Sequence, residues 1–220
     1  MKILIHAVPE RMWYVREFLL PALQAQGADQ VEIWNDAEHA GNLAACMAAF
    51  AACDSEGGTW HLQDDVLPCR DFVRRCRELE DAGLVYGFCC RNFTDRLDAF
   101  GTVYAPDAWH SFQCVRIPDS WARECAEWVR GEHWRRESPM PELPILWELN
   151  KGDDSFFHEF IQCRHGDVIV ENVRPNLVEH VDWLIGGSYL QPWRGYLARA
   201  EYWDDEDLID ALHERLRARV

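Results

Sequence analysis

The chain contains 220 residues, which is enough for one well-buried α/β domain or for two very small ones. Hydrophobic residues make up 48% of the chain and charged residues 27%, as in ordinary globular proteins, so we expect a folded chain rather than a disordered one. The formal net charge of −16 repels nucleic-acid phosphates and anionic membranes at long range, which argues against a protein that coats nucleic acid.

Cysteine usage and the apolar runs favour a cytoplasmic protein. The apolar run at residues 3–7 is interrupted by Pro9, Glu10 and Arg11, so it is too short for a secretory signal or a membrane span. None of the nine cysteines forms a Cys-x-x-Cys pair, and most have apolar neighbours. We therefore expect reduced core thiols rather than a disulfide framework or a zinc site.

The first half of the chain alternates between strand and helix patterns. Strands are predicted at residues 2–7, 31–34, 59–63 and 84–90. Helices are predicted at residues 11–26 and 42–53, and from Pro68 to a stop at Gly83. Such alternation implies a parallel sheet with right-handed crossovers, in which ligands bind beyond the carboxyl ends of the strands. Asp36, Asp64 and Asp65 each follow a predicted strand and therefore belong to that edge.

The second half is less regular. Its predicted elements are a loop at 91–110, a strand at 111–117, a helix from Pro118 and Asp119, a helix after Gly152, a strand at 168–170 and a last helix from about Glu206. Three prolines within residues 131–145 indicate a flexible or lid-like segment.

Two adjacent carboxylates at the end of an apolar strand need an explanation. Asp64 and Asp65 repel each other, and burying both without partners carries a large desolvation penalty. A hard divalent cation relieves both penalties, because Mg²⁺ or Mn²⁺ binds one or two carboxylates together with phosphate oxygens. The alternative is that the pair caps a helix beginning at Pro68, where carboxylates accept backbone N–H bonds.

The order of these parts resembles the nucleotide-sugar half of GT-A glycosyltransferases. The chain runs through a first strand, a second strand that ends near Asp36, a helix that opens at Asn42, and an apolar strand that ends in Gln63, Asp64 and Asp65. The resemblance implies an α/β, Rossmann-like GT-A fold with a mostly parallel central sheet flanked by helices.

The same resemblance implies a single GT-A-like domain over residues 1–220. Its nucleotide-sugar-binding half would cover about residues 1–100, and its acceptor-binding half, with the C-terminal helix, about residues 101–220. Short enzymes of this kind occur among bacterial cell-surface polysaccharide enzymes and in phage genomes, and the sequence does not choose between the two settings.

Gln63, Asp64 and Asp65 resemble the Asp-x-Asp or Glu-Asp-Asp motif of that family. The resemblance implies that Asp65 binds the metal directly and that Asp64 contacts the ribose or a metal-bound water. Gln63 departs from the pattern, because it is neutral where the family often has a carboxylate. We assign Gln63 and Asp64 to the nucleotide and Asp65 to the metal.

Two later motifs follow in the order of the family. Asp153 and Asp154 resemble the late acidic motif that supplies the base in inverting GT-A enzymes, and a positioned carboxylate is a reasonable base for an acceptor hydroxyl. We favour Asp154 over Asp153, because Asp153 also suits the N-cap of the next helix. His180 resembles the late histidine that completes the coordination of the cation in several branches, the alternative being a structural histidine.

Four further residues are candidates for substrate contacts. Asp36 lies where the family often binds the nucleobase or ribose, although it also suits a turn. Asn42 opens a helix whose N-terminus can bind a diphosphate, although it also suits a simple cap. Trp109 and Trp134 are the candidates for stacking on an acceptor sugar, whereas Trp121 and Trp128 have the helical spacing of core residues.

The leading hypothesis is a metal-dependent hexosyltransferase-like enzyme, inverting in outcome. It would use Mn²⁺ or Mg²⁺ to transfer a sugar from a nucleotide-diphosphate sugar, with UDP-sugars favoured. The acceptor would be a hydroxyl of a glycan, a lipid-linked sugar or a modified DNA base, DNA being disfavoured by the net charge. The sequence gives no oligomeric state.

Two other functions are alternatives. A nucleotidyltransferase on a similar sheet would usually show a glycine-rich basic loop after the first strand, where this chain has residues 6–10, His-Ala-Val-Pro-Glu. A non-catalytic acidic binding module would leave the ordered acidic motifs unexplained.

Overall fold

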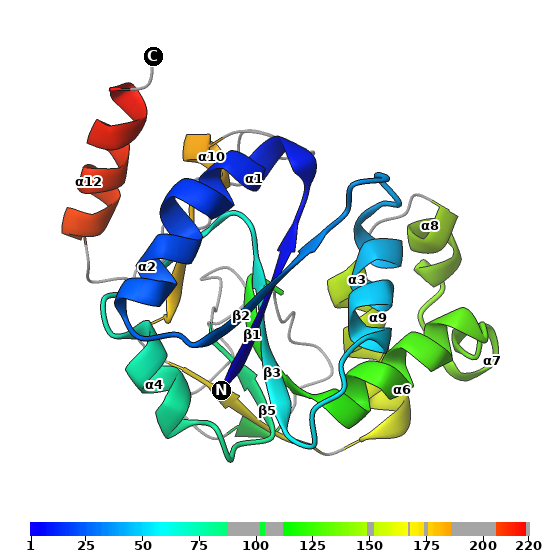
Figure 1. Ribbon diagram of the computed structural model, residues 1–220. Helices are drawn as coiled ribbons and strands as arrows, with labels where there is room; N and C mark the ends of the chain where they lie inside the picture. Colours follow the sequence, from blue (N-terminus) through cyan, green and yellow to red (C-terminus); the bar gives the residue numbers. More distant parts are fainter. Residues whose placement is uncertain are drawn as a thin grey trace.

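The computed structural model describes residues 1–87, 102–103, 112–148, 152–166, 168–173, 176–185 and 206–218. Within these residues a seven-stranded sheet is covered by helices on both faces (Figure 1). The strand order is β2-β1-β3-β7-β5-β8-β6. A separate two-stranded sheet pairs β4 with β9.

The amino-terminal strands form the parallel part of the sheet. β1 (Lys2–Ala7) lies between β2 (Gln30–Asn35) and β3 (Gly58–Gln63) and pairs in parallel with both. In this register the carboxyl ends of β1, β2 and β3 meet at one edge, because Ala7 pairs with Asn35 and His6 with Gln63. The carboxyl ends of these three strands therefore lie together, as the sequence predicts.

The rest of the sheet adds strands of both directions. β7 (Cys114–Pro118) pairs antiparallel with both β3 and β5 (Leu84–Tyr86). β8 (Ile169–Asn172) is parallel to β5, and β6 (Thr102–Val103) is antiparallel to β8. β2, β1, β3, β5 and β8 therefore run in one direction and β7 and β6 in the other, which confirms the predicted α/β fold with a mostly parallel sheet.

One local prediction was wrong. The strand order itself was not predicted: β7, from much later in the chain, lies between β3 and β5. Pro68 does not begin a helix: it ends β4 (Val66–Pro68), and α4 (Phe72–Glu78) begins four residues later. The reason is tertiary, because β4 pairs with β9 (Val178–His180) and all three β4 residues are buried. Asp64 and Asp65 therefore do not cap a helix that begins at Pro68, so this alternative is excluded.

One face of the sheet is covered by the first helical segment together with α4 and α12 (Glu206–Arg217) (Figure 1). The predicted helix at 11–26 is a succession of a 3₁₀ turn, α1, a π-helical turn and α2, which are Pro9–Arg11, Met12–Tyr14, Val15–Leu19 and Leu20–Ala25. Leu19, Leu23, Ile209 and Leu212 bury their side chains in the core on this face.

The opposite face is covered by α3 (Asn42–Ala51), α6 (Asp119–Arg130) and α9 (Asp153–Arg164). Asp119, which is fully buried, joins the start of α6 to β3, since its carboxylate accepts bonds from the Thr59 hydroxyl at 2.8 Å and the Ser55 hydroxyl at 2.7 Å. Much of the predicted lid-like segment is helical. It contains α7 (Trp134–Glu137) and the start of α8 (Leu143–Glu148), and Trp134 and Leu143 anchor it in the core.

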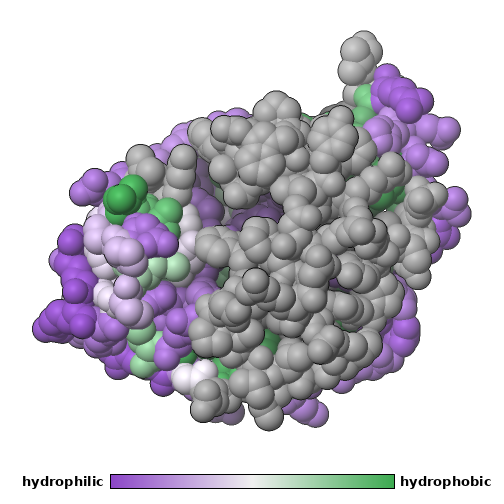
Figure 2. Space-filling model, turned by 180° about the vertical axis from the view of Figure 1, so that it is seen from behind, coloured by the Kyte–Doolittle hydropathy of each residue, from purple (hydrophilic) through white to green (hydrophobic). Residues whose placement is uncertain are grey.

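The described cysteines are mostly buried, and the described surface is mostly hydrophilic. The seven cysteines within the described residues are free thiols, and all but Cys163 are buried. On the side of the molecule shown in Figure 2, the described surface is mostly hydrophilic, as expected from a net charge of −16. Among the described residues, no helix combines the length and the apolar character needed to cross a membrane. The short helix α10 (Asp182–Ile185) follows β9.

Candidate functional site

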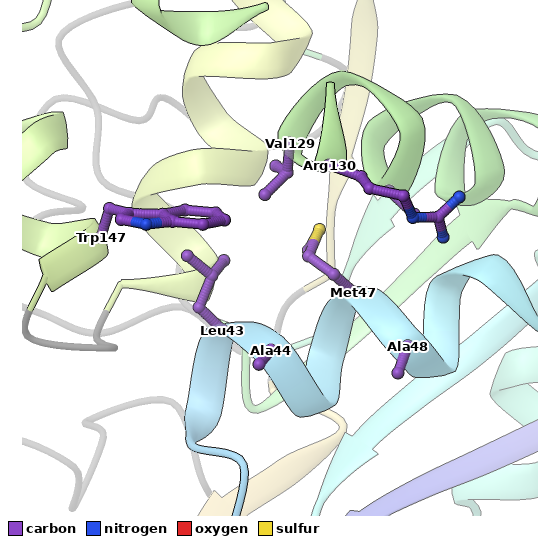
Figure 3. A pocket seen from close by; sticks show the side chains of 8 residues that line it. Leu43, Ala44, Met47, Ala48, Val129, Arg130 and Trp147 are labelled. Carbon is purple, nitrogen blue, oxygen red and sulfur yellow. The ribbon is translucent and has the colours of Figure 1, made fainter. Parts of the chain in front are cut away.

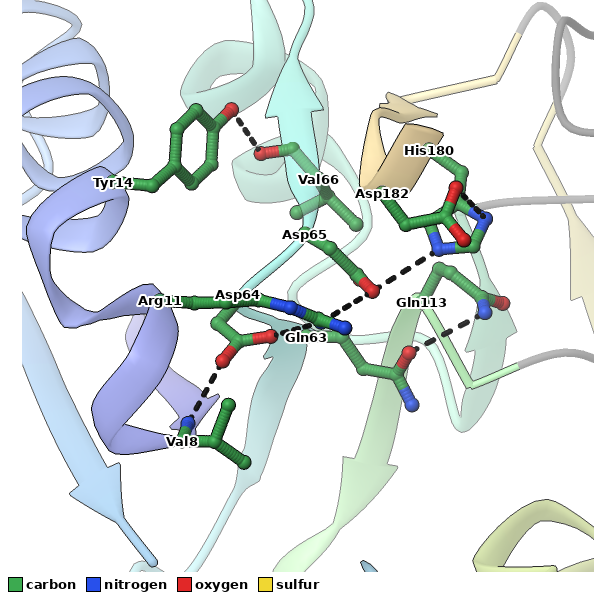
Figure 4. Close-up of polar contacts among 10 residues, drawn as sticks. All are labelled: Val8, Arg11, Tyr14, Gln63, Asp64, Asp65, Val66, Gln113, His180 and Asp182. Carbon is green, nitrogen blue, oxygen red and sulfur yellow. Dashed lines mark hydrogen bonds and ion pairs between the residues drawn. The ribbon is translucent and has the colours of Figure 1, made fainter. Parts of the chain in front are cut away.

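The turn after β3 brings Asp65 and His180 together. β3 ends at Gln63, Asp64 and Asp65 form the turn, and β4 begins at Val66. Because Val66 pairs with His180 in the β4–β9 ladder, the side chain of His180 lies beside Asp65, with Nε2 3.2 Å from Asp65 Oδ2 (Figure 4). The two residues assigned to the metal, 115 positions apart in sequence, are thus adjacent in space.

Arg11 lies between the two carboxylates of the turn. Its Nη1 atom is 2.7 Å from Asp64 Oδ1 and 2.6 Å from Asp65 Oδ2, and the backbone N–H of Val8 donates to Asp64 Oδ2 at 2.8 Å (Figure 4). Sequence reasoning missed this residue, treating it only as an interruption of an apolar run. Its position just beyond the carboxyl end of β1, where ligands of such sheets bind, was the available signal.

Burial and charge act differently on the two carboxylates. For Asp64, burial and the neighbouring charge of Asp65 outweigh the attraction of Arg11 and raise its pKa to about 6. For Asp65, burial also favours the neutral acid, but the charges of His180 and Arg11 outweigh it and lower its pKa to about 2. Asp65 is therefore ionised at neutral pH, as a metal ligand must be.

His180 completes a small buried cluster with Asp182. Burial disfavours the imidazolium, but Asp65 and Asp182 outweigh burial, so the pKa of His180 is raised above its usual value. Asp182 Oδ1 lies 3.7 Å from His180 Nδ1, on the opposite side of the ring from Asp65 (Figure 4). A carboxylate on the far nitrogen is a common way to orient a histidine that uses its other nitrogen as a ligand.

Asp65 and His180 fit a divalent cation as a two-residue donor set. Asp65 Oδ1 is buried and has no hydrogen-bond partner among the described residues. Carboxylate and imidazole suit Mn²⁺, and Mg²⁺ also accepts one or two carboxylates with the remaining positions filled by phosphate and water. No group of three or more His, Cys, Asp or Glu side chains in the described part of the chain is arranged to hold a metal. The protein would therefore supply only part of the coordination shell.

The three residues assigned to the nucleotide besides Asp64 also lie at the carboxyl ends of the strands. The side chain of each, Gln63, Asp36 and Asn42, forms a hydrogen bond within the protein. Gln63 Oε1 accepts a bond from Gln113 Nε2 at 3.3 Å. Asp36 accepts bonds from the backbone N–H groups of Ala40 at 2.8 Å and Gly41 at 3.2 Å, which is the turn role considered for it. Contacts of these three residues with a nucleotide stay predictions.

Asn42 links α3 to the late acidic motif. It is the first residue of α3, and its Nδ2 donates to Asp153 Oδ1 at 2.6 Å. Gly152, with φ +79°, is the N-cap of α9, so Asp153 is the first helical residue rather than the cap. Asp153 is 5% exposed, whereas Asp154 is half-buried and accepts the backbone N–H of Ser155 at 2.8 Å.

The two aspartates are therefore suited to different roles. Asp153 is buried and engaged by Asn42, and burial together with the charge of Asp154 raises its pKa to about 7. Asp154 is the more accessible carboxylate and hence the better placed to meet a substrate.

The raised pKa of Asp153 predicts a loss of stability with increasing pH. Between pH 4 and pH 7 the folded state keeps the Asp153 proton, while the unfolded state, with an ordinary pKa of 3.8, has released it. Because the unfolded state then binds fewer protons, the contribution of Asp153 to the free energy of unfolding falls across this window. We expect the Asp153→Asn variant to gain stability relative to the wild type as the pH rises from 5 to 8 in urea denaturation, and a constant difference would contradict the assignment.

The acceptor assignment of Trp134 is wrong. Trp134 is 1% exposed and packs against Phe156 and Trp147, so it offers no face to a sugar. The physical reason is its place in α7, which turns the indole into the core of the α3–α6–α9 face. Trp109 lies outside the described residues.

Trp147, which sequence reasoning did not select, lines a cavity. The cavity has a volume of about 390 Å³ and lies between α3, α6 and α8, with Trp147 and Leu43 on one side and Arg130 at another end (Figure 3). Its lining residues are Leu43, Ala44, Met47, Ala48, Ala126, Val129, Arg130 and Trp147. Leu43 follows Asn42 directly, so the cavity begins next to the Asn42–Asp153 contact.

Comparison with known proteins finds similar structures but no similar sequence. No profile of a known protein family and no curated protein sequence matches the chain. The crystal structure of TarS residues 1–349 from S. aureus is similar over 100% of this chain and 83% of that one, with a TM-score of 0.52 and 11% identity. A structure of A197 from STIV aligns over 81% of this chain and 84% of its own at 12% identity, with a TM-score of 0.39. The chain therefore shares the overall fold of TarS.

Proposed function

We propose that this protein is a metal-dependent glycosyltransferase that moves a sugar from a nucleotide-diphosphate sugar to an acceptor hydroxyl with inversion. The observation that carries the proposal is the contact between Asp65 and His180, 3.2 Å apart at the carboxyl end of β3 in a fold of the GT-A type. Transferase activity is what the similarity to TarS suggests, and the residues at the ligand edge supply the chemistry.

Asp65 and His180 are the residues that would hold Mn²⁺ or Mg²⁺. The ion, when bound, supplies positive charge to the diphosphate that leaves from the donor sugar. Asp182 orients the imidazole of His180 from its far side. Asp64, which accepts the N–H of Val8, is the proposed contact of the ribose or of a metal-bound water. Asp36, Asn42 and Gln63 are proposed contacts of the nucleotide.

Asp154 is the proposed base. The acceptor hydroxyl loses its proton as its oxygen attacks the anomeric carbon, and a half-exposed carboxylate at the start of α9 can accept that proton. Asp153 supports this role indirectly, because its bond to Asn42 fixes the first turn of α9 against α3.

The acceptor is proposed to bind over the second half of the chain, which carries α6, α8 and α9. The cavity lined by Leu43, Met47 and Trp147 offers an apolar wall to part of an acceptor, beside the Asn42–Asp153 contact. Glycans, lipid-linked sugars and modified DNA bases are the classes to be tested, DNA being disfavoured by the charge of −16.

Calorimetry with nucleotides tests the proposal most directly. We expect UDP to bind in the presence of Mn²⁺ and to bind much more weakly after chelation of the metal, with GDP as the comparison nucleotide. A panel of nucleotide-sugars, scored for hydrolysis, would then identify the donor. No metal-dependent binding of either nucleotide at millimolar concentration would refute the proposal, and nucleoside triphosphate turnover without sugar release would indicate a nucleotidyltransferase instead.

A further inference from the structure

The arginine at the centre of the carboxylate cluster has no role in the function proposed above. Arg11 is 9% exposed, and one of its nitrogen atoms, Nη1, contacts both Asp64 and Asp65 at 2.7 and 2.6 Å. A charge-assisted contact of this length to two carboxylates is strong, and it neutralises part of the repulsion between them. Arg11 is therefore the counter-cation of Asp65, the same carboxylate that is proposed to bind the metal.

The chain around Arg11 is fixed on both sides. On one side the N–H of Val8 donates to Asp64, and on the other the fully buried hydroxyl of Tyr14 donates to the carbonyl of Val66 at 2.9 Å. Both bonds end on residues that adjoin Asp65 in the chain. The segment that carries Arg11 is thus hydrogen-bonded to the turn on both sides of the arginine. This fixes the position of the guanidinium, whereas an arginine on the surface can change its position freely.

The charges of the cluster leave room for a further cation. Asp64, Asp65 and Asp182 carry three carboxylates, which face the guanidinium of Arg11 and the imidazole of His180. Even with a protonated imidazole, the carboxylates outnumber the positive groups of this cluster. The arrangement stabilises the folded protein without a metal, yet it still attracts an additional positive charge.

We propose that Arg11 is the resident cation of the Asp64–Asp65 pair and a positioning residue that makes binding of the divalent cation depend on the nucleotide. When the ion binds together with a diphosphate, Arg11 keeps its contact with Asp64 but loses its contact with Asp65, which then binds the ion. This inference rests on the proposed function, because it concerns the same carboxylates.

The physical reason is repulsion between two nearby positive charges in a buried site. A divalent ion on Asp65 lies within a few ångströms of the guanidinium, and low local polarisability strengthens their repulsion. The negative charge of a nucleoside diphosphate offsets that repulsion, so ion and nucleotide bind cooperatively. By linkage, the nucleotide must then raise the affinity of the protein for the ion by the same factor by which the ion raises its affinity for the nucleotide.

The test is a titration of Mn²⁺, followed by electron paramagnetic resonance of the free ion, with and without UDP. We expect the wild type to bind Mn²⁺ weakly alone and more tightly with UDP. Arg11→Met should bind Mn²⁺ alone roughly tenfold or more tightly than the wild type, with a smaller further gain from UDP. An unchanged or weaker affinity of the variant for Mn²⁺ alone would overturn the inference.

Two further variants keep the test interpretable. If Arg11→Met unfolds because two adjacent carboxylates lose their counter-cation, the double variant Arg11→Met/Asp64→Asn removes one of those charges. Because Asp64→Asn itself removes a charge that attracts the ion, the double variant is compared with Asp64→Asn alone and should bind Mn²⁺ more tightly than that single variant. Arg74→Met is the matched control, because Arg74 also contacts two carboxylates, those of Asp71 and Glu78, but on the exposed surface of α4. It should leave the affinity for Mn²⁺ unchanged.

The outcomes separate this inference from the proposed function. Wild-type binding of Mn²⁺ with UDP that is insensitive to Arg11→Met refutes the role of Arg11 and leaves the function standing. Binding of Mn²⁺ by Arg11→Met alone, with none by the wild type even with UDP, refutes both metal dependence of the wild type and the coupling of ion and nucleotide through Arg11. Binding by neither protein refutes both.

Discussion

Replacement of Asp65 by alanine is expected to abolish metal-dependent binding of the nucleotide. Asp65 has the lower pKa of the two carboxylates of the turn, about 2, and its Oδ1 is buried without a hydrogen-bond partner among the described residues. Loss of the residue that supports a metal ligand typically costs about 10–100-fold in metal affinity, and loss of the ligand itself should cost roughly 100-fold or more. Calorimetry with UDP, at saturating Mn²⁺ and after chelation, measures the difference.

The control for this experiment is Asp71→Ala. Asp71 also pairs with an arginine, Arg74, but it lies at the start of α4, outside the carboxylate cluster. It should retain the full effect of Mn²⁺ on nucleotide binding. Circular dichroism must show that Asp65→Ala is folded, since the substitution leaves His180 and Arg11 with one acidic partner fewer. Metal-dependent binding that persists in a folded Asp65→Ala protein would remove Asp65 from the site.

Asp154→Asn is expected to spare nucleotide binding and to stop turnover. An asparagine has nearly the same shape as aspartate but cannot accept the proton of the nucleophile, and a general base commonly contributes about 10²–10⁴-fold to a rate. We expect a loss of this size in the hydrolysis of the nucleotide-sugar selected by the donor panel. The affinity for UDP with Mn²⁺ should not change.

Two variants define what the result means. Asp29→Asn, at an exposed position before β2, should keep the full rate. Asp153→Asn should keep the base but weaken the contact with Asn42, so a partial loss is expected there. If Asp154→Asn retains the wild-type rate while Asp153→Asn loses it, Asp153 is the base, and its pKa near 7 should then appear as the midpoint of the rate against pH.

Much of the edge that carries the site could be predicted from local sequence. The strands at the start of the chain alternate with helices, and polar residues follow the strand ends, so the position of Asp36, Asp64 and Asp65 at one edge followed from the pattern alone. The acceptor prediction for Trp134 failed because residues 131–145 were expected to form a flexible or lid-like segment, whereas the short helix α7 holds Trp134 against the core. Its indole lies in the core, and Trp147 faces the cavity instead.

The contacts that give the edge its chemistry were decided by long-range pairing. Arg11 reaches Asp64 across 53 residues, and Asn42 reaches Asp153 across 111. His180 meets Asp65 only because β9 pairs with β4, which is also why Pro68 ends a strand instead of starting a helix.

The sequence by itself therefore determined the fold class and the residues at the ends of the first three strands, because periodicity and turn chemistry act between near neighbours. Only the tertiary structure decided which charges share a buried volume. That depends on strand order, and strand order is fixed by burial and pairing between segments far apart in the chain. Arg11 is the clearest case: a charged residue that ends an apolar run in the sequence becomes the counter-cation of two aspartates in the fold.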